Sequence, residues 1–402
     1  MSDPTPGDNP FEGLPFLGDL AGMLSRQGPV SWDAARQLAA YVATGGLPEA
    51  NVEPLARMKL EELARVAELR VSGASGLSTS TTGAPVQVVT VTRGEWARRT
   101  LDAWRPVLER LAVTMSGGPE GEGAPGIDGL DEAEDAATQL VGGLMKMVAP
   151  MLLGMQSGAM VGHLARRALG QYELPVPRPP SDELIVVETN IDELAAEWSL
   201  PGDDLRLWIC VNELAHHAVL GVPHVRDRLQ SLLLEYVGGF RPQPGLLEER
   251  LGSIDPADPG ALQAALSEPG TLLGAMQSPA QQALVPQLDA LIAVIAGYVD
   301  HVLDVAGSDL ISSYGMLTEA LHRRRVEASP ADRFVEQLLG LSLGREQYER
   351  GEAFVAGVVE RAGAEGLDPL WRSPQGLPTP NEVDAPGLWL ARLELDQPGG
   401  DA

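Results

Sequence analysis

The chain has 402 residues, of which 44% are hydrophobic, and its mean hydropathy of -0.03 excludes a disordered polypeptide and predicts a large buried core. Its 29 Lys and Arg residues stand against 56 Asp and Glu residues, and the formal charge of -27 predicts repulsion from nucleic acid and from anionic lipid. We therefore expect no nucleic-acid partner and no membrane partner.

Cysteine content and the first residues both indicate a cytoplasmic protein. The single cysteine, Cys210, cannot form an intramolecular disulfide, and its apolar surroundings favour a thiol in the core. Residues 1–10 lack the basic flank and apolar run of a signal peptide. Leu140–Leu164 is apolar enough to suggest a membrane span, but Lys146 and Pro150 interrupt it, and we interpret it as part of a buried helical hairpin.

Hydrophobic periodicity predicts a mainly α-helical fold with a small β element, since two stretches rich in β-branched residues have the pattern of strands. In chain order we predict helices over residues 15–25, 31–44 and 53–69, a strand at 86–92, a helix over 95–115, a helical hairpin over 136–169, a strand at 184–188, a helix from about 192, a helix capped by 201–204, then helices over 225–236, 244–251, 259–267, 280–303, 308–325 and 331–340, with one or two more between 344 and 389.

Two stretches bear on how the helices are assembled. Gly154, Gly158 and Gly162 recur at a spacing of four residues, which places them on one helix face and predicts close contact with the backbone of a neighbouring helix. Residues 116–135 are rich in Gly, Pro, Asp and Glu, which predicts a flexible acidic insertion that does not separate two domains. We therefore predict one domain over residues 1–402.

The stretch Trp208–His217 carries the most informative pattern of the chain. In a His-Glu-x-x-His helix the two histidines lie one turn apart on one face and share a zinc ion, while the glutamate activates a zinc-bound water molecule. Here Glu213 and His216 occupy the positions of the general base and the second ligand, but Asn212 replaces the first histidine. A neutral carboxamide is a poor zinc ligand, so we expect zinc binding to be weak or absent.

Glu213 also has an interpretation that involves no catalysis. A carboxylate in such an apolar helix costs several kcal/mol unless it is paired, as an order of magnitude. Without zinc, Glu213 could pair with an arginine, or its pKa could rise until the group is neutral. Three of the histidines outside this region, His163, His224 and His322, are interpreted as surface or loop residues that bind no metal, and His301, next to Asp300, is expected to point elsewhere.

Several motifs in the same order resemble the zincin-like metallopeptidase family, whose members are described as candidate hydrolases and one branch of which is associated with coenzyme F420 biosynthesis. The matching stretches are Asn9–Leu20, Gly28–Asp33, Leu169–Arg178, Trp208–His216, Gly221–Asp227, Gln347–Gly351 and Leu377–Glu382. The resemblance implies a mainly helical zincin-like domain with a small β element and a zinc site on the central helix.

The resemblance also shows where this chain departs from its family. Members that look active have His-Glu-x-x-His where this chain has Asn212–His216, and a glutamate as third ligand where this chain has Ala296. Asp300, one turn beyond Ala296, could reach a metal only if the backbone were displaced. His217 leaves the helix about 100° from His216, so the two cannot face one ion.

Three functions remain open. The first is a degenerate zincin, a pseudoenzyme that keeps the cleft but binds zinc weakly or not at all and acts on a peptide or protein ligand by binding it. The second is an active zinc metallopeptidase in which Glu213 activates water on a metal held by unusual ligands. The third is a helical interaction or scaffold protein without catalysis.

Overall fold

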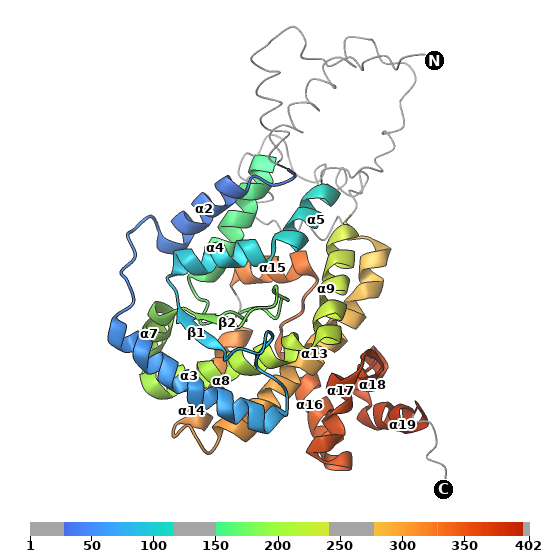
Figure 1. The fold of residues 1–402 in the computed structure, drawn as a ribbon. Coiled ribbons are helices and arrows are strands. Elements are labelled where there is room, and N and C mark those ends of the chain that lie inside the picture. The colour runs from blue at the N-terminus through green and yellow to red at the C-terminus, as the bar shows by residue number, and fades with distance from the viewer. Residues whose placement is uncertain (1–27, 116–149, 241–276, 328, 397–402) are drawn as a thin grey trace, which may run out of the picture.

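The computed structural model describes residues 28–115, 150–240, 277–327 and 329–396 (Figure 1). This part of the chain is mainly α-helical around a two-stranded sheet, as predicted. The predicted helices over 15–25, 244–251 and 259–267, the acidic insertion over 116–135 and the first half of the hairpin lie outside the described residues.

The first half of the described chain contains α2 (Trp32–Thr44), α3 (Pro54–Ser75), β1 (Gln87–Thr90), α4 (Arg93–Ala103), α5 (Arg105–Met115), helical residues 150–165, β2 (Glu183–Val186), α7 (Glu188–Glu197), α8 (Gly202–Gly221) and α9 (Pro223–Gly238). The second half contains α13 (Pro279–Gly307), α14 (Tyr314–Val326), α15 (Pro330–Leu339), α16 (Arg345–Ala362), η2 (Ala364–Leu367), α17 (Pro369–Arg372), η3 (Pro374–Gly376), α18 (Pro380–Asp384) and α19 (Pro386–Asp396).

Several helix predictions need correction, and the helix predicted from about 192 already begins at Glu188. The helix predicted over 95–115 is two helices that meet at Trp104, because Pro106 has no amide hydrogen and is tolerated only in the first turn of a new helix. The helix predicted from 308 begins at Tyr314, since α13 continues to Gly307. The region 344–389 forms more and shorter helices than predicted, where prolines such as Pro369 repeatedly begin new ones.

Both predicted strands are confirmed and form one parallel pair, with Gln87 opposite Glu183 and Thr90 opposite Val186. On the far side of β2, Gly170 forms an isolated antiparallel bridge to Val186. The segment around Gly170 therefore covers one edge of the sheet, and β1 forms the other edge.

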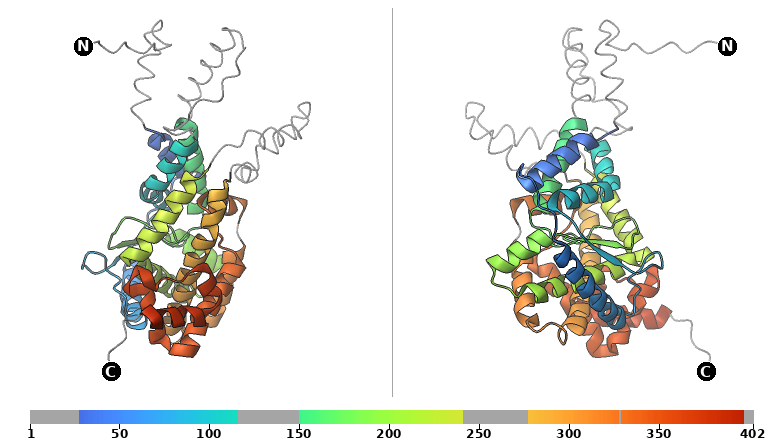
Figure 2. Two further views of the ribbon diagram at one scale, coloured as in Figure 1. Left: turned by 90° about the vertical axis from the view of Figure 1, so that its right-hand side faces the viewer. Right: turned by 60° about the vertical axis from the view of Figure 1, so that its left-hand side comes forward.

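The long helix α13 is the centre of the fold and packs against α3, α8, α9 and α16 (Figures 1 and 2). Ser278 and Gln281 close its N-terminus by exchanging side-chain and backbone hydrogen bonds. Among the described residues it is the one helix long and apolar enough to cross a membrane, but 72% of its most apolar window is buried in the protein. These properties fit the core helix of a globular fold.

Glycines bring two helix pairs into backbone contact. A Cβ atom on Gly154 or Gly158 would lie 2.3 Å from a backbone oxygen of α2 or its N-cap, and one on Gly162 would lie 2.8 Å from the oxygen of Ala39. The predicted contact with a neighbouring helix is therefore confirmed, and that helix is α2. Gly297 of α13 and Gly351 of α16 touch in the same way, since a Cβ on Gly297 would lie 2.3 Å from the Gly351 carbonyl carbon.

Candidate functional site

Helix α8 carries the motif through the middle of the protein. Its first turn contains Asp203 and Asp204, whose charge suits the positive end of the helix dipole, and Asp204 accepts hydrogen bonds from Ser312 and Ser313. Every residue from Leu207 to Leu220 is buried. The chain therefore places Asn212, Glu213 and His216 in the interior, where each polar group needs a partner.

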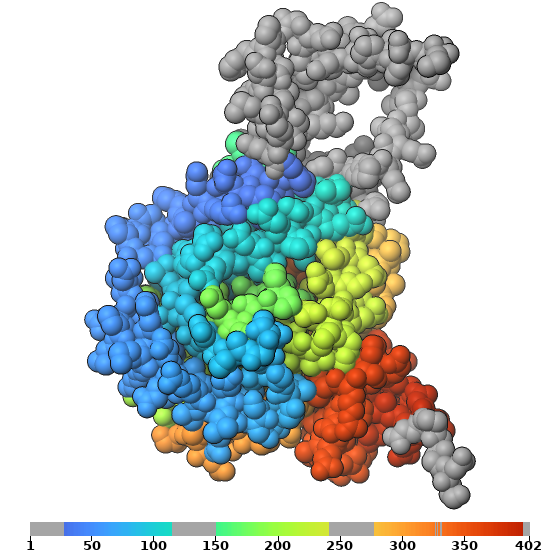
Figure 3. All heavy atoms as spheres, viewed as in Figure 1, coloured from blue at the N-terminus to red at the C-terminus, as the bar shows by residue number. Residues whose placement is uncertain are grey.

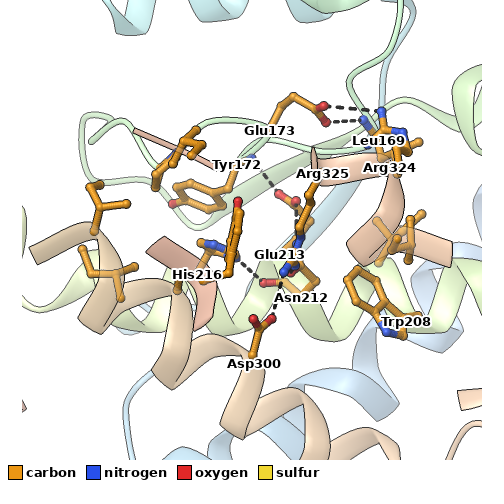
Figure 4. A pocket seen from close by; sticks show the side chains of 18 residues that line it. Leu169, Tyr172, Glu173, Trp208, Asn212, Glu213, His216, Asp300, Arg324 and Arg325 are labelled. Atoms are coloured by element: carbon orange, nitrogen blue, oxygen red, sulfur yellow. Dashed lines mark hydrogen bonds and ion pairs between the residues drawn. The ribbon is translucent and has the colours of Figure 1, made fainter. Parts of the chain in front are cut away.

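A cavity of about 80 Å³ opens above these three residues (Figure 4). Its wall is formed by α8, by the segment 169–175, by α13 and by the end of α14. Ala296 and Asp300 of α13 both line it, as their spacing of one turn predicts, and Arg324 and Arg325 of α14 line it from the opposite side. The residues at the motif positions singled out in the sequence therefore line one cleft.

Arg325 binds across this cleft. One Nη atom donates to Asn212 Oδ1 over 3.1 Å, and the other donates to Asp300 Oδ1 over 2.9 Å. The Arg325 and Asp300 side chains are only 19% and 18% exposed, so the ion pair is largely withdrawn from solvent. A guanidinium group therefore bridges the residue at the first ligand position and the only carboxylate of α13 that lines the cleft.

His216 is held by its own helix and by an aromatic ring. Its Nδ1 donates to the backbone oxygen of Asn212 over 2.9 Å, which leaves Nε2 as the free ring nitrogen. The ring stacks on Tyr172 with centroids 5.8 Å apart and planes 16° apart. Burial, together with a smaller effect of the nearby Arg325 charge, lowers its pKa to about 4, so the imidazole is neutral at physiological pH.

Glu213 is paired with backbone amides and an amide side chain. Its Oε2 accepts from the Tyr172 amide over 2.8 Å, and its Oε1 accepts from Asn212 Nδ2 over 3.3 Å. Burial raises its pKa to about 7, against the opposing effect of the Tyr172 amide. The raised pKa agrees with the second of the two interpretations without zinc, and within the described ranges no arginine forms an ion pair with Glu213.

Gly170 makes this arrangement possible. A Cβ atom at that position would lie 2.3 Å from Glu213 Cδ, so a side chain cannot be accommodated there without displacing the carboxyl group. The Gly170 carbonyl accepts from Trp96 Nε1 over 2.7 Å, which fixes the segment from its other side. The segment 169–175 therefore forms the roof of the cleft.

The other histidines lie apart from the cleft, as predicted. His217 Nδ1 forms a hydrogen bond with the Tyr172 hydroxyl over 2.9 Å, and His217 does not line the cavity. His163 and His322 are exposed. His224 is half-buried and donates from Nε2 to the Leu370 oxygen over 2.9 Å. Cys210 is fully buried, which raises its thiol pKa.

Sequence reasoning missed two residues that define the site, Tyr172 and Arg325. Tyr172 lies 41 residues from Glu213, and Arg325 lies 113 residues from Asn212. A signal for the second did exist, because Arg323, Arg324 and Arg325 form a run of three arginines at the end of a helix. Arg324 is also engaged, through a hydrogen bond to Glu173 over 3.4 Å.

The donor set can be compared with what zinc requires. Across the described ranges, no three His, Cys, Asp or Glu side chains come together in a group that could hold a metal ion. At the motif itself, His216 offers Nε2, Asn212 offers an oxygen that already accepts from Arg325, and Ala296 offers no donor. These residues do not form the three-ligand set of a catalytic zinc site.

Comparison with known proteins shows which family the chain resembles. The sequence profile of the zincin-like metallopeptidases matches residues 30–390. The chain belongs to the zincin-like metallopeptidase family. This zincin-like chain is also similar to a solved structure from Chloroflexus aurantiacus, described as that of a candidate hydrolase with a novel fold. The two are 25% identical with a TM-score of 0.62, over 92% of this chain and 100% of that chain. No curated protein matches the chain.

Proposed function

We propose that this zincin-like protein is a pseudoenzyme, which keeps the family's cleft and binds a peptide or protein segment without hydrolysing it. The observation that carries the proposal is the Arg325 guanidinium, which binds Asn212 and Asp300 inside the cleft. We therefore expect the zinc ion that the family implies to bind weakly or not at all, as the sequence also predicted.

The electrostatics of the cleft support this proposal. A divalent cation a few ångströms from a guanidinium is repelled by several kcal/mol, even at an effective dielectric constant of about 20. Arg325 already neutralises Asp300, so the carboxylate that could have served as a substitute ligand is engaged. The positive charge that a metal ion would supply comes instead from the Arg325 side chain. This explains how the polar groups of the cleft are stabilised without a metal.

Zinc content of the purified protein tests this proposal. We expect the wild-type protein to contain no stoichiometric zinc by elemental analysis, and Asn212→His alone to gain none, because the guanidinium remains. The triple variant Asn212→His, Ala296→Glu, Arg325→Met should gain zinc. The matched control carries Arg323→Met in place of Arg325→Met, since Arg323 is 62% exposed and outside the cleft. Stoichiometric zinc in the wild-type protein, lost in His216→Ala, would overturn the proposal.

A second candidate function is an active hydrolase, and one observation favours it. Glu213 lines the cleft with a pKa raised to about 7, which is the range suited to a general base at neutral pH. The activity of the wild-type protein on a mixture of fluorogenic peptides, compared with that of Glu213→Gln, separates the two functions. Turnover that is lost in this variant would establish the hydrolase, whereas equal background rates support the pseudoenzyme.

A further inference from the structure

A hollow of about 560 Å³ lies between α3 and β1, separate from the cleft. One wall is a face of α3, and the other is the stretch from Pro85 to Thr90, which includes the whole of β1. The segment 169–172, which borders the cleft, lies at the opposite edge of the sheet. In Figure 3 α3, drawn in blue, forms part of the molecular surface. The hollow is therefore a second concave feature, and its nature does not depend on the zinc site.

The sheet presents an edge to this hollow, beside which the Val86 amide donates to Glu68 Oε1 of α3 over 3.4 Å. The amides of Gln87 and Val91 donate to the oxygens of Asp182 and Val186, on the side of β2. Because successive residues of a strand point to alternate sides, the backbone groups of Val88 point to the opposite edge, as do those of Thr90. Within the described residues, that edge has no partner strand. Such an edge can accept an extended peptide as an added strand.

A buried hydroxyl group also lacks a partner here. Thr90 lines the hollow and is 7% exposed, yet its Oγ1 has no hydrogen-bond partner in the part of the chain that the structure describes. A buried hydroxyl without a partner costs about 1 to 3 kcal/mol. The Oγ1 atom is itself buried, so a chain bound in the hollow lies beside Thr90 and does not reach its hydroxyl, and the proposal rests on the edge of β1 and the charges of α3.

The charges of α3 define the chemistry of the ligand. Arg57, Glu61 and Arg65 line the hollow, are exposed and make no ion pair among the described residues. They follow one another at four-residue steps, which is about 6 Å along a helix. Alternate residues of an extended strand are about 6.6 Å apart and lie on one face. The α3 charges therefore match a strand with acidic, basic and acidic residues at positions i, i+2 and i+4.

An apolar surface adjoins the charged face. Leu55, Met58 and Leu69 are exposed by 75%, 65% and 75%, and at 100° per residue they fall within an arc of about 60° on α3. This arc lies next to the face that carries Arg65. Exposed apolar residues grouped beside a groove are typical of a protein-binding surface.

We propose that the α3–β1 hollow binds an extended protein segment with the pattern acidic-x-basic-x-acidic, which adds to β1 as a third strand. The backbone of the segment pairs with Val88 and Thr90, and its charged side chains pair with Arg57, Glu61 and Arg65. This gives the protein a partner of defined chemistry, whether or not the cleft is catalytic.

A charge-swap experiment tests the proposal. The probe is a fluorescein-labelled nine-residue peptide with Asp, Lys and Asp at positions 3, 5 and 7 and Thr or Val at the others, measured by fluorescence anisotropy with the full chain. We expect Arg57→Glu, Glu61→Lys, Arg65→Glu to weaken binding at least tenfold and a Lys, Asp, Lys peptide to recover it. These exposed positions should tolerate reversal, and Arg345→Glu, Glu349→Lys on exposed α16 positions is the matched control.

A second probe tests the added strand. The same peptide, N-methylated at alternate residues, cannot donate to the β1 edge, and we expect its binding to fall at least tenfold. Three results would overturn the proposal: no saturable binding of the first peptide, equal binding by the charge-reversed variant, or equal binding of the methylated peptide. A wild-type dimer in sedimentation that the charge reversal dissociates would also overturn it, because the edge would then belong to a second copy of this chain.

Discussion

The two edges of the small sheet are built in opposite ways. At the edge of β2, Gly170 bridges to Val186, and the chain then places the Tyr172 amide on Glu213 with no space for even one added carbon. At the edge of β1, the strand faces a hollow of about 560 Å³ and a buried hydroxyl group without a partner. Tight packing thus closes the edge of the sheet beside the cleft, while the opposite edge borders a hollow.

The largest expected effect comes from adding a side chain at Gly170, at the closed β2 edge of the sheet. Gly170→Ala places a Cβ 2.3 Å from Glu213 Cδ, so either the roof segment or the carboxyl group must move. We expect the free energy of unfolding to fall by more than about 3 kcal/mol in urea denaturation. Gly73→Ala is the control, since nothing lies within 4 Å of its Cβ and α3 should gain about 1 kcal/mol from the better helix former. Equal stability of the two variants would show that the edge is not closed.

The second effect is a pH dependence of stability. Burial raises the Glu213 pKa from 4.5 to about 7, so the folded state holds this proton more tightly than the unfolded state does. Its contribution to stability is fully present below about pH 4.5 and is lost as pH rises through 7. Glu213→Gln should therefore gain stability relative to wild type by about 3 kcal/mol between pH 4.5 and pH 8. A constant difference across this range would contradict the assigned pKa.

The third effect tests the arginine that bridges the cleft. Arg325→Met leaves Asp300 largely buried without its partner, and we expect a loss of about 2 kcal/mol, reduced from the value for a fully buried pair by partial exposure. Adding Asp300→Asn should recover part of it, as a double-mutant cycle would show. Arg323→Met, on the exposed side of α14, should change stability by less than about 0.5 kcal/mol.

The smallest effect concerns the open edge. Thr90→Val removes the unpartnered Oγ1 and keeps the β-branched shape, so the variant should be as stable as wild type or more stable by about 0.5 to 1 kcal/mol. Thr100→Val is the contrasting variant, because the Thr100 hydroxyl accepts from Arg178 over 2.8 Å, and its loss should destabilise the protein. Destabilisation by Thr90→Val would mean that this hydroxyl already has a partner.

Local patterns in the sequence predicted most of the described fold. The two strands were found to within a few residues because each is a short β-branched run, and the glycine spacing at Gly154–Gly162 predicted a helix contact that the structure confirms. The sequence could not show which helix makes that contact. It also missed the break at Trp104, since the apolar periodicity continues across the two helices that meet there.

From the sequence, only the part of the candidate site that lies on a single helix could be predicted. Asn212, Glu213 and His216 share a cleft because the spacing of a single helix places them together. Asp300 of α13 lines the same cleft, whereas the sequence predicted that it could reach a metal only if the backbone were displaced. The side chain that decides the chemistry, Arg325, comes from a distant helix whose position depends on packing of the whole chain. Single-sequence periodicity carries no information on such a contact.

The glycine contact between α13 and α16 has a consequence for shortening the chain. Gly297 and Gly351 touch through their backbones, three residues before Asp300 of the cleft. A chain cut before residue 345 would expose that face of the central helix to water, and no side chain there could close the gap. We expect such a truncation to abolish the cooperative melting transition of the whole protein. The C-terminal helices would then fold together with the rest of the protein as one cooperative unit.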